Sequence, residues 1–403
     1  MTDVTKRLAA VWPRLPARSR RARGVGLAPG LLALAVALGS PARASGEDEV
    51  PATIAPFFRP PAEFAADLGP YKSPLTFNDG RPVRSTDDWR RRRREIIETW
   101  HEIMGPWPPL IERPDMQVLE RLPQDGYTRR RVRLKVAPDR TTDGYLLVPD
   151  GPGPFPAVLV VFYEPETAIG QGKRPGRLDF ADGLARRGIA ALSIGFDPGG
   201  IDPAGSGLEL QPLSYLAYVA ANGYNALASL PEIDPARVGV MGHSYGGKWA
   251  MFASCLYEKF ACGVWSDPGI VFDEARSNVN YWEPWYLGWE PGRTRTRGVI
   301  TPESPRTGAY KRLVESGHDL HELHALMAPR PFLVSGGSED PPERWRALNH
   351  AVAVNTLLGH VGRVAMTNRP DHSPTVESNE QIYRFLEHVL KPVRAVLAPK
   401  GAP

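Results

Sequence analysis

The chain has 403 residues, of which 42% are hydrophobic, and its 49 lysines and arginines exceed its 45 aspartates and glutamates to give a formal net charge of +4. This length suits one large α/β domain or two smaller domains. The basic excess lies in the first 44 residues, which hold eight basic residues and one acid, so the remainder carries about −3. Beyond these residues, the charge gives no support to nucleic-acid binding.

Residues 1–44 have the pattern of an export signal. Basic residues are frequent from Lys6 to Arg23, an apolar stretch covers 25–38, and residues 42–44 form an A-x-A cleavage site. The apolar stretch is too short to span a bilayer permanently. We therefore expect a protein that is exported to the periplasm or secreted. The pair Arg20-Arg21 leaves the twin-arginine route open beside the general secretory route.

Residues 45–115 are predicted to form an N-terminal arm and a helix that pack on the main domain. The arm is rich in proline, alanine and glycine, and the helix is expected over 85–104. Five consecutive arginines, 90–94, lie in this helix between acids and apolar residues. That pattern favours a solvated helix face over a basic binding patch.

Residues 116–395 are predicted to form one catalytic domain of the α/β class. Strands are expected at 117–121, 128–136, 144–148, 157–162, 190–194, 237–241, 262–265, 331–334 and 363–366, and helices at 178–187, 213–230, 248–259, 345–358 and 378–390. Antiparallel strands come first, and strands then alternate with helices. This order indicates a single doubly wound, mostly parallel sheet.

The sequence Gly-His-Ser-Tyr-Gly at 242–246 stands between a predicted strand and a predicted helix. This G-x-S-x-G pattern is typical of a nucleophile elbow, in which a strained turn lifts the serine above the sheet edge. The N–H groups at the start of the following helix point at any oxyanion formed there. We therefore expect Ser244 to be the nucleophile and the Tyr245 backbone N–H to be one oxyanion donor. The second should come from Tyr163 or Glu164, after the strand at 157–162.

A serine hydroxyl needs a base to remove its proton and an acid to orient that base. With this type of elbow, the chain order is serine, acid, histidine. His372, in the loop after the last predicted strand, is the expected base. Asp340, in the glycine-rich turn after the strand at 331–334, is the preferred acid. Asp267, which directly follows the preceding strand, and Glu339 are the alternatives.

The longest interruption between two predicted strands, residues 269–325, is typical of a lid or binding insertion. Five aromatic residues lie within 281–289, among them Trp282 and Trp285. Aromatic faces suit the apolar faces of sugar rings, so these side chains are candidates for substrate binding. They are equally compatible with a small core of the insertion itself.

The sequence predicts neither a metal nor an organic cofactor. Three histidines within 318–324 would diverge around a helix and do not indicate an open metal site. His243 is expected to pack under the elbow. Export would permit a disulfide between Cys255 and Cys262, but two buried thiols are equally plausible.

Residues 116–390 resemble the α/β-hydrolase superfamily through the elbow, the Asp340 turn and the His372 loop. Within that superfamily, residues 242–248 resemble the G-x-S-R-x-G-K elbow of glucuronoyl esterases. The helix ahead of the domain is also similar to exported glucuronoyl and acetylxylan esterases, and so is Trp345 after the acid turn.

The resemblance implies that Lys248 contacts sugar hydroxyls and that Trp345 contributes to the substrate site. The alternative for Lys248 is a solvated helix residue. Tyr245 stands where glucuronoyl esterases have an arginine that assists the oxyanion site. A uronate ester and an acetyl ester therefore both remain candidate substrates.

Together these features predict an exported serine hydrolase that cleaves carboxylic esters on a polysaccharide or oligosaccharide through an acyl-enzyme. A peptidase of the prolyl-oligopeptidase type, which has the same triad order, is one alternative. Such peptidases usually carry a propeller ahead of the catalytic domain. A non-catalytic carbohydrate-binding protein on a hydrolase fold is the other alternative. No nucleic-acid partner is expected, and the sequence does not give the oligomeric state.

Overall fold

The computed structural model describes residues 50–391 except 139, 175, 197–209, 277–280 and 294–297. The predicted export signal, the first residues of the predicted arm and residues 392–395 of the predicted catalytic domain lie outside the described residues. Among the residues that are described, no helix is long and apolar enough to cross a membrane.

The N-terminal arm contains two 3-10 turns, at Ala55–Phe58 and Ala62–Phe64, and leads into α1, Thr86–Met104. The helix begins where the Ser85 side chain accepts a hydrogen bond from the Asp88 N–H. It buries one apolar face, made of Trp89, Ile96, Trp100 and Met104. Helical spacing puts these four side chains on one face of α1, where they join the cluster of buried residues that also contains Leu323 and Phe252.

Arg92 departs from the solvated face predicted for the five arginines. Its side chain is buried and donates to the Pro74 carbonyl at 3.3 Å, the Asn78 side chain at 2.6 Å and the Glu95 carboxylate at 3.0 Å. The prediction is wrong at this position because the guanidinium finds three oxygen partners that replace water. Arg92 thereby ties the arm to α1.

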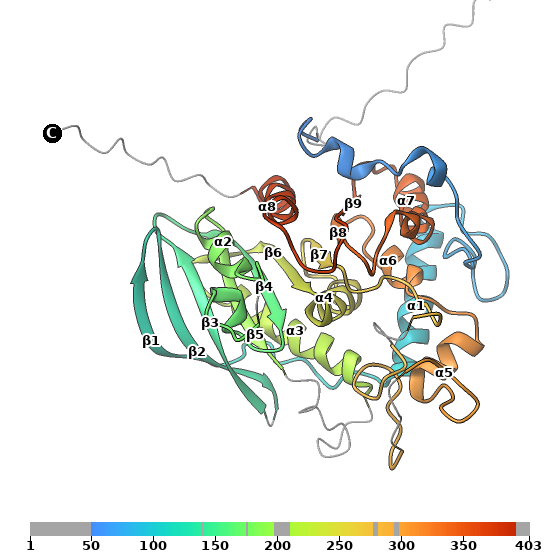
Figure 1. Ribbon diagram of the computed structural model, residues 1–403, viewed down its shortest axis with the longest axis horizontal. Helices are drawn as coiled ribbons and strands as arrows, with labels where there is room; N and C mark the ends of the chain where they lie inside the picture. Colours follow the sequence, from blue (N-terminus) through green and yellow to red (C-terminus); the bar gives the residue numbers. More distant parts are fainter. Residues whose placement is uncertain are drawn as a thin grey trace, which may run out of the picture. The chain divides into compact units, whose positions relative to one another are not determined.

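The described strands form one nine-stranded sheet in the order β1-β2-β3-β5-β4-β6-β7-β8-β9 (Figure 1). Pairing is antiparallel from β1 to β3 and between β3 and β5, and parallel from β5 through β4 to β9. The predicted mostly parallel sheet with antiparallel N-terminal strands is confirmed. The strands are β1 Met116–Gln124, β2 Tyr127–Ala137, β3 Arg140–Pro149, β4 Phe155–Phe162, β5 Ala190–Gly195, β6 Ile233–His243, β7 Gly263–Ser266, β8 Phe332–Gly336 and β9 Val364–Asn368.

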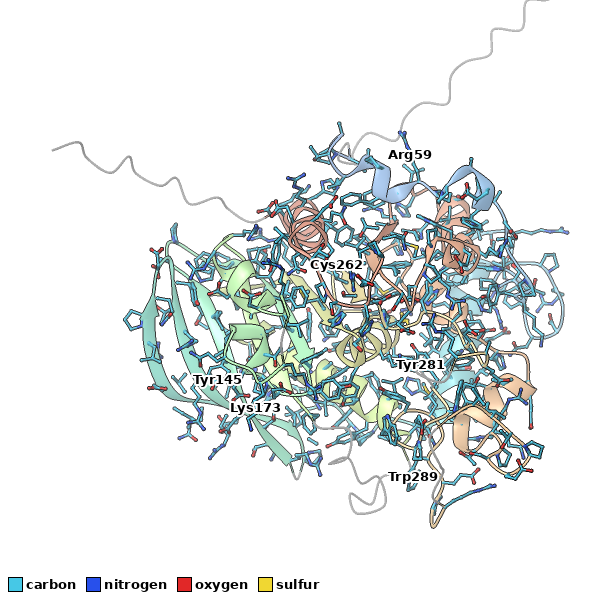
Figure 2. All side chains as sticks on the ribbon, in the orientation of Figure 1. Arg59, Tyr145, Lys173, Cys262, Tyr281 and Trp289 are labelled. Atoms are coloured by element: carbon cyan, nitrogen blue, oxygen red, sulfur yellow. The ribbon has the colours of Figure 1, made fainter. Side chains whose placement is uncertain are left out.

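Helices cover both faces of the sheet (Figure 1). One face carries α2 and α8, and the other carries α3, α4, α6 and α7. The central strand β4 is buried on both sides, so alternate residues enter different cores: Leu159 and Val161 face the α3–α4 side, and Val158 and Val160 face the α2–α8 side. The helices are α2 Phe180–Ala185, α3 Pro212–Ala228, α4 Tyr245–Leu256, α5 Gly308–Glu315, α6 His321–Leu326, α7 Trp345–Leu357 and α8 Val376–Leu390. Side chains fill the space between these layers (Figure 2).

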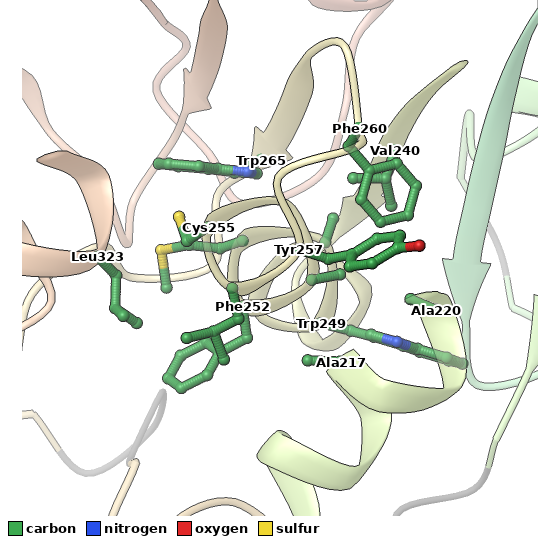
Figure 3. Close-up of a cluster of buried hydrophobic side chains, with 14 of the residues drawn as sticks. Ala217, Ala220, Val240, Trp249, Phe252, Cys255, Tyr257, Phe260, Trp265 and Leu323 are labelled. Atoms are coloured by element: carbon green, nitrogen blue, oxygen red, sulfur yellow. The ribbon is translucent and has the colours of Figure 1, made fainter. Parts of the chain in front are cut away.

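Large aromatic side chains pack around α4 (Figure 3). Trp249 is fully buried and donates to the Leu216 carbonyl of α3 at 2.5 Å, and Trp265 of β7 stacks on Phe332 of β8 at 4.4 Å. Burying one such side chain contributes about 1.5–3 kcal/mol. This core fixes the start of α4, where the predicted nucleophile lies.

Candidate active site

Ser244 lies between β6 and α4 with φ 56° and ψ −115°, a left-handed conformation that a non-glycine residue seldom adopts. Its N–H donates to the Ser266 carbonyl of β7 at 2.8 Å. The neighbouring glycines allow this turn: a Cβ on Gly242 would lie 2.2 Å from the Gly246 carbonyl oxygen, and one on Gly246 would lie 2.1 Å from that of Val161. The strand, strained turn and helix expected of an elbow are therefore present.

The imidazole of His372 is bonded to Asp267. Its Nδ1 lies 2.7 Å from Asp267 Oδ2, and the histidine side chain remains 38% exposed while the carboxylate is fully buried. His372 follows β9, and Asp267 follows β7. The preference for Asp340 as the partner of this histidine is therefore corrected in favour of the alternative, Asp267.

Asp267 is held by three further hydrogen bonds. The backbone N–H groups of Gly337, Glu339 and Asp340 donate to Oδ1 at 2.6, 3.1 and 2.9 Å. Burial alone would raise the pKa of Asp267, but the bond from His372 and the charge of Arg369 hold it below its ordinary value. The carboxylate is thus kept ionised and aimed at the imidazole.

The two other candidate acids have different partners. Asp340 Oδ2 accepts the Gly269 N–H at 2.8 Å, and its Oδ1 accepts the Ile270 N–H at 2.6 Å. Burial, followed by the nearby Asp267, raises the pKa of Asp340 to about 6. Glu339 forms an ion pair with Arg276 at 3.0 Å. Both side chains are engaged by the loop after β7 and not by the imidazole.

His243, directly before the nucleophile, is buried beneath the site. Its ring lies 4.7 Å from the His372 ring and 6.5 Å from Phe162. Its Nδ1 is 3.1 Å from Ser266 Oγ. Burial, with a smaller effect from His372, lowers its pKa to about 3, so the ring is neutral. This position agrees with the packing role expected for His243.

Tyr163 and Tyr245, whose backbone N–H groups are the predicted oxyanion donors, lie side by side. Their rings stack with centroids 4.5 Å apart. Tyr163 directly follows β4, and Tyr245 is the first residue of α4, where helix N–H groups point out of the helix. The guanidinium of Arg174 covers the Tyr163 ring at 3.8 Å and lies 3.3 Å from the Glu164 carboxylate.

A pocket of about 670 Å³ adjoins this loop. Acidic, basic and amide side chains line it. The lining residues are Glu164, Glu166, Gln171, Gly172, Lys173 and Arg174. The pocket therefore presents both hydrogen-bond donors and acceptors close to the predicted oxyanion site.

Lys248, which the resemblance implied as a sugar contact, is 3% exposed. Its amine donates to the Pro268 carbonyl and lies 4.5 Å above the centre of the Tyr281 ring. Burial lowers the pKa of Lys248 to about 7, against the raising effect of Asp340 and other nearby acids. Neither the solvated helix residue nor an open sugar ligand describes this side chain, because its amine already binds the loop after β7.

The predicted aromatic ligands are mostly core residues. Trp282 is 1% exposed and packs on Tyr310 at 5.6 Å, and Trp345, the first residue of α7, is 2% exposed. Their proposed sugar contacts are corrected, since almost no surface of either ring is accessible. Trp285 is half-buried and packs on Tyr286 at 6.2 Å. The buried aromatic residues of the insertion belong to the main core and not to a separate one, since Tyr281 stacks on Phe252 of α4 at 6.3 Å.

Cys255 and Cys262 are free, buried thiols. Burial raises the pKa of both, that of Cys262 to about 12, so neither is a reactive thiolate. Within the described ranges, no group of three or more histidine, cysteine or acidic side chains could hold a metal ion.

Sequence reasoning missed Arg369, which lies directly after β9 and is buried behind the Asp267–His372 pair. Its position in the sequence, between an apolar strand and the loop of the predicted catalytic histidine, could have marked Arg369 as a candidate site residue. It also missed α5 and α6 within the insertion, and α6 is short and has histidines where apolar residues would mark a helix.

Comparisons with known proteins support the fold. Residues 220–391 match the prolyl oligopeptidase family, and residues 119–261 match the FrsA-like esterases. A 4-O-methyl-glucuronoyl methylesterase from Schizophyllum commune is 25% identical over 274 residues, which are 64% of this chain and 65% of that protein. The match thus spans less than two thirds of this relative.

Solved structures of similar fold include two bacterial glucuronoyl esterases. The enzyme from Solibacter usitatus has a TM-score of 0.62 and 19% identity, over 81% of this chain and 99% of that one. The enzyme from Teredinibacter turnerae has a TM-score of 0.60 and 19% identity, over 80% and 90% of the two chains. At these identities the likeness shows the fold, which is the α/β-hydrolase fold predicted from the sequence.

Proposed function

We propose that this chain is a serine hydrolase that cleaves carboxylic esters on a polysaccharide or oligosaccharide. The observation that carries the proposal is the 2.7 Å bond between His372 and Asp267. The His372 ring lies 4.7 Å from the ring of His243, which directly precedes Ser244 in the strained turn. A buried ionised acid that fixes one imidazole nitrogen leaves the other nitrogen to act as a base. The similarity to an esterase family and to a glucuronoyl methylesterase supports an ester as the substrate.

In the proposed reaction, Ser244 Oγ attacks the ester carbonyl carbon while His372 Nε2 takes the hydroxyl proton. The backbone N–H groups of Tyr245 and Tyr163 stabilise the negative charge that develops on the carbonyl oxygen. His372 then protonates the departing alcohol as the acyl-enzyme forms. Water next attacks the acyl carbon and gives a proton to His372. The bond between the acyl carbon and Ser244 Oγ then breaks, His372 returns the proton to Oγ, and the carboxylic acid leaves.

Either a uronate ester or an acetyl ester is the proposed substrate. The pocket beside Tyr163 combines carboxylates, a guanidinium and an amide, the groups that hydrogen-bond the hydroxyls of a sugar ring. A pocket of uniform positive charge would instead favour an anion. We therefore assign the carbohydrate part of the substrate to this pocket.

Initial hydrolysis rates of the wild type and Ser244→Ala test the proposal on a glucuronate alkyl ester and on an acetylated xylo-oligosaccharide. We expect turnover of at least one ester and a loss of about 10⁴-fold in kcat in the variant. Ser229→Ala, which changes an exposed serine at the end of α3, is the matched control and should retain full activity. A residual rate above a few per cent in Ser244→Ala would refute the nucleophile.

A peptidase is the second candidate, because residues 220–391 match the prolyl oligopeptidase family. A blocked peptide with proline before the scissile bond belongs in the same assay. Cleavage of this peptide without either ester would move the assignment to a peptidase. Binding of xylo-oligosaccharide without turnover of any substrate would support a carbohydrate-binding protein.

We also propose that the protein is exported, on the strength of residues 1–44. The expected outcome is a mature protein that begins at Ser45. N-terminal sequencing of the protein recovered from the periplasm or medium of a bacterial host would check this, and recovery of the full chain in the cytoplasm would contradict it.

A further inference from the structure

Arg369 joins three parts of the site through one buried side chain. It is the first residue after β9, and its side chain is only 4% exposed. The backbone N–H donates to the Gly336 carbonyl at 3.0 Å, which continues the pairing of β9 with β8. The guanidinium therefore starts from a fixed backbone position at the carboxyl end of the sheet.

One edge of the guanidinium holds the end of β8. Nη1 donates to the Ser335 carbonyl at 2.8 Å, to Ser335 Oγ at 3.1 Å and to the Gly336 carbonyl at 3.3 Å. The other nitrogens hold the histidine loop. Nη2 donates to the His372 carbonyl at 2.6 Å, and Nε donates to the Ser373 carbonyl at 3.0 Å. Because the guanidinium is planar and rigid, these bonds fix the loop relative to the strand.

The same group lies next to the acid. Nη2 is 4.0 Å from Asp267 Oδ2, the oxygen that binds His372 Nδ1. A buried carboxylate is costly without a compensating charge. Arg369 supplies that charge without taking the oxygen that the imidazole needs.

A second branch runs from Arg369 through Ser266 to His243. Nη2 lies 3.4 Å from Ser266 Oγ, and Ser266 Oγ lies 3.1 Å from His243 Nδ1. The Ser266 hydroxyl can accept a hydrogen bond from Arg369 and share a second one with His243, so it links the two side chains. A neutral His243 ring adds no charge against the imidazolium that forms on His372, whose ring is 4.7 Å away.

We propose that Arg369 is the positioning residue of this site: it fixes the His372 loop on the ends of β7 and β8, so that the imidazole meets the Asp267 carboxylate. The expected effect of Arg369 on the rate of hydrolysis rests on the proposed function. Arg369 acts through His372 and Asp267, and none of its contacts reaches the exposed side of the histidine.

Arg369→Lys and Arg369→Met test the proposal, with Arg330→Lys as the matched control. Arg330 is half-buried and likewise donates to several carbonyls, those of Ser254, Phe260 and Leu326, but it lies before β8, at the opposite end of that strand. Three quantities are measured: the rate of labelling of Ser244 by a fluorophosphonate, kcat and KM for the ester, and the downfield proton resonance of the His372–Asp267 hydrogen bond. Thermal unfolding and near-ultraviolet circular dichroism of each variant report folding.

We expect labelling and kcat to fall about 10²-fold in Arg369→Met and less in Arg369→Lys, with KM unchanged, because misplacing a catalytic group by about 1 Å costs this much. Arg330→Lys should lower the melting temperature while keeping the wild-type labelling rate. A folded Arg369→Met with a labelling rate within twofold of the wild type would overturn the proposal. The proposal would also be overturned if Arg330→Lys and Arg369→Met had the same melting temperature and lost the same fraction of the labelling rate.

The proton resonance separates this proposal from the proposed function. If the wild type hydrolyses no ester and resists the fluorophosphonate, the proposed hydrolase fails. A resonance that is then present in the wild type and in Arg330→Lys, and absent from Arg369→Met, still upholds Arg369 as the residue that positions His372. A resonance retained in Arg369→Met overturns that role.

Discussion

The carboxylates of Asp267 and Asp340 each accept hydrogen bonds from the backbone of the other's loop. Asp267 accepts the Asp340 N–H at 2.9 Å, and Asp340 accepts the N–H groups of Gly269 and Ile270 at 2.8 and 2.6 Å. Two loops that follow neighbouring parallel strands are thereby locked together. Only Asp267 also contacts His372, so the two acids have separate tasks.

Replacing each acid by its amide should distinguish these tasks. Asp267→Asn should lower kcat by about 10⁴-fold, because an amide favours the wrong imidazole tautomer. Asp340→Asn should lower kcat by about 10-fold to 10²-fold. An amide has only one oxygen, so only one of the N–H groups of Gly269 and Ile270 keeps its acceptor, and the loop shifts. The ratio of the two kcat values is the measurement. A larger loss in Asp340→Asn would identify Asp340 as the acid.

The choice between these acids shows where sequence reasoning ends. The elbow and His372 are local features, because each requires only a strand end and a short loop with the right residues. Asp267 and Asp340 both satisfy the same local rule. Which one meets the histidine depends on the positive φ of Asp267, 51°, and on the way the two loops pack. Neither the φ angle of Asp267 nor the packing of the two loops can be derived from the sequence alone.

The sequence also did not predict that certain charged side chains are buried. The alternation of strands and helices predicted the nine-stranded sheet, since apolar periodicity reports which faces are covered. It did not predict that Arg92 and Lys248 are buried, because their oxygen partners come from segments distant in sequence, including Asn78 and Pro268. Trp282 matched a sugar-binding pattern and a core pattern equally well.

Lys248→Met should reduce hydrolysis of a sugar ester and of p-nitrophenyl acetate alike. The amine holds the Pro268 carbonyl in the loop that carries Asp267, so its loss should lower kcat for both by about 10-fold to 10²-fold and leave KM nearly unchanged. Lys259→Met, at an exposed position just after α4, is the control and should match the wild type. A rise in KM confined to the sugar ester would show instead that Lys248 contacts the sugar.

The geometry of the elbow predicts that alanine at two adjacent glycines, Gly246 and Gly247, lowers stability by different amounts. A Cβ at Gly246 would lie 2.1 Å from the Val161 carbonyl oxygen, whereas one at Gly247 would lie 3.0 Å from that of Ser266. We expect Gly246→Ala to lower the free energy of unfolding by about 3 kcal/mol or more, and Gly247→Ala by about 1 kcal/mol or less. Urea denaturation checks both values. Equal stabilities would mean that β4 and α4 can separate without cost.

His321 should make stability depend on pH below neutrality. It is buried, its Nε2 lies 2.6 Å from the Lys72 carbonyl, and its ring packs on Tyr71 and His350 at 5.0 and 4.8 Å. Burial lowers its pKa from 6.5 to about 4. Between these values the unfolded chain binds a proton that the folded protein excludes, so stability falls as the pH is lowered from about 6.5 to about 4.

The difference between the wild type and His321→Gln isolates this effect. Burial raises the pKa of Asp319 to about 7 and that of Asp340 to about 6, and these acids change stability in the opposite direction over much of the same range. Their contribution is common to both proteins and cancels in the difference. Between pH 8 and pH 4, the free energy of unfolding changes in both proteins. The decrease should be about 3 kcal/mol larger in the wild type than in His321→Gln. Parallel pH profiles in urea denaturation would mean that the folded protein accepts the proton on His321 without cost.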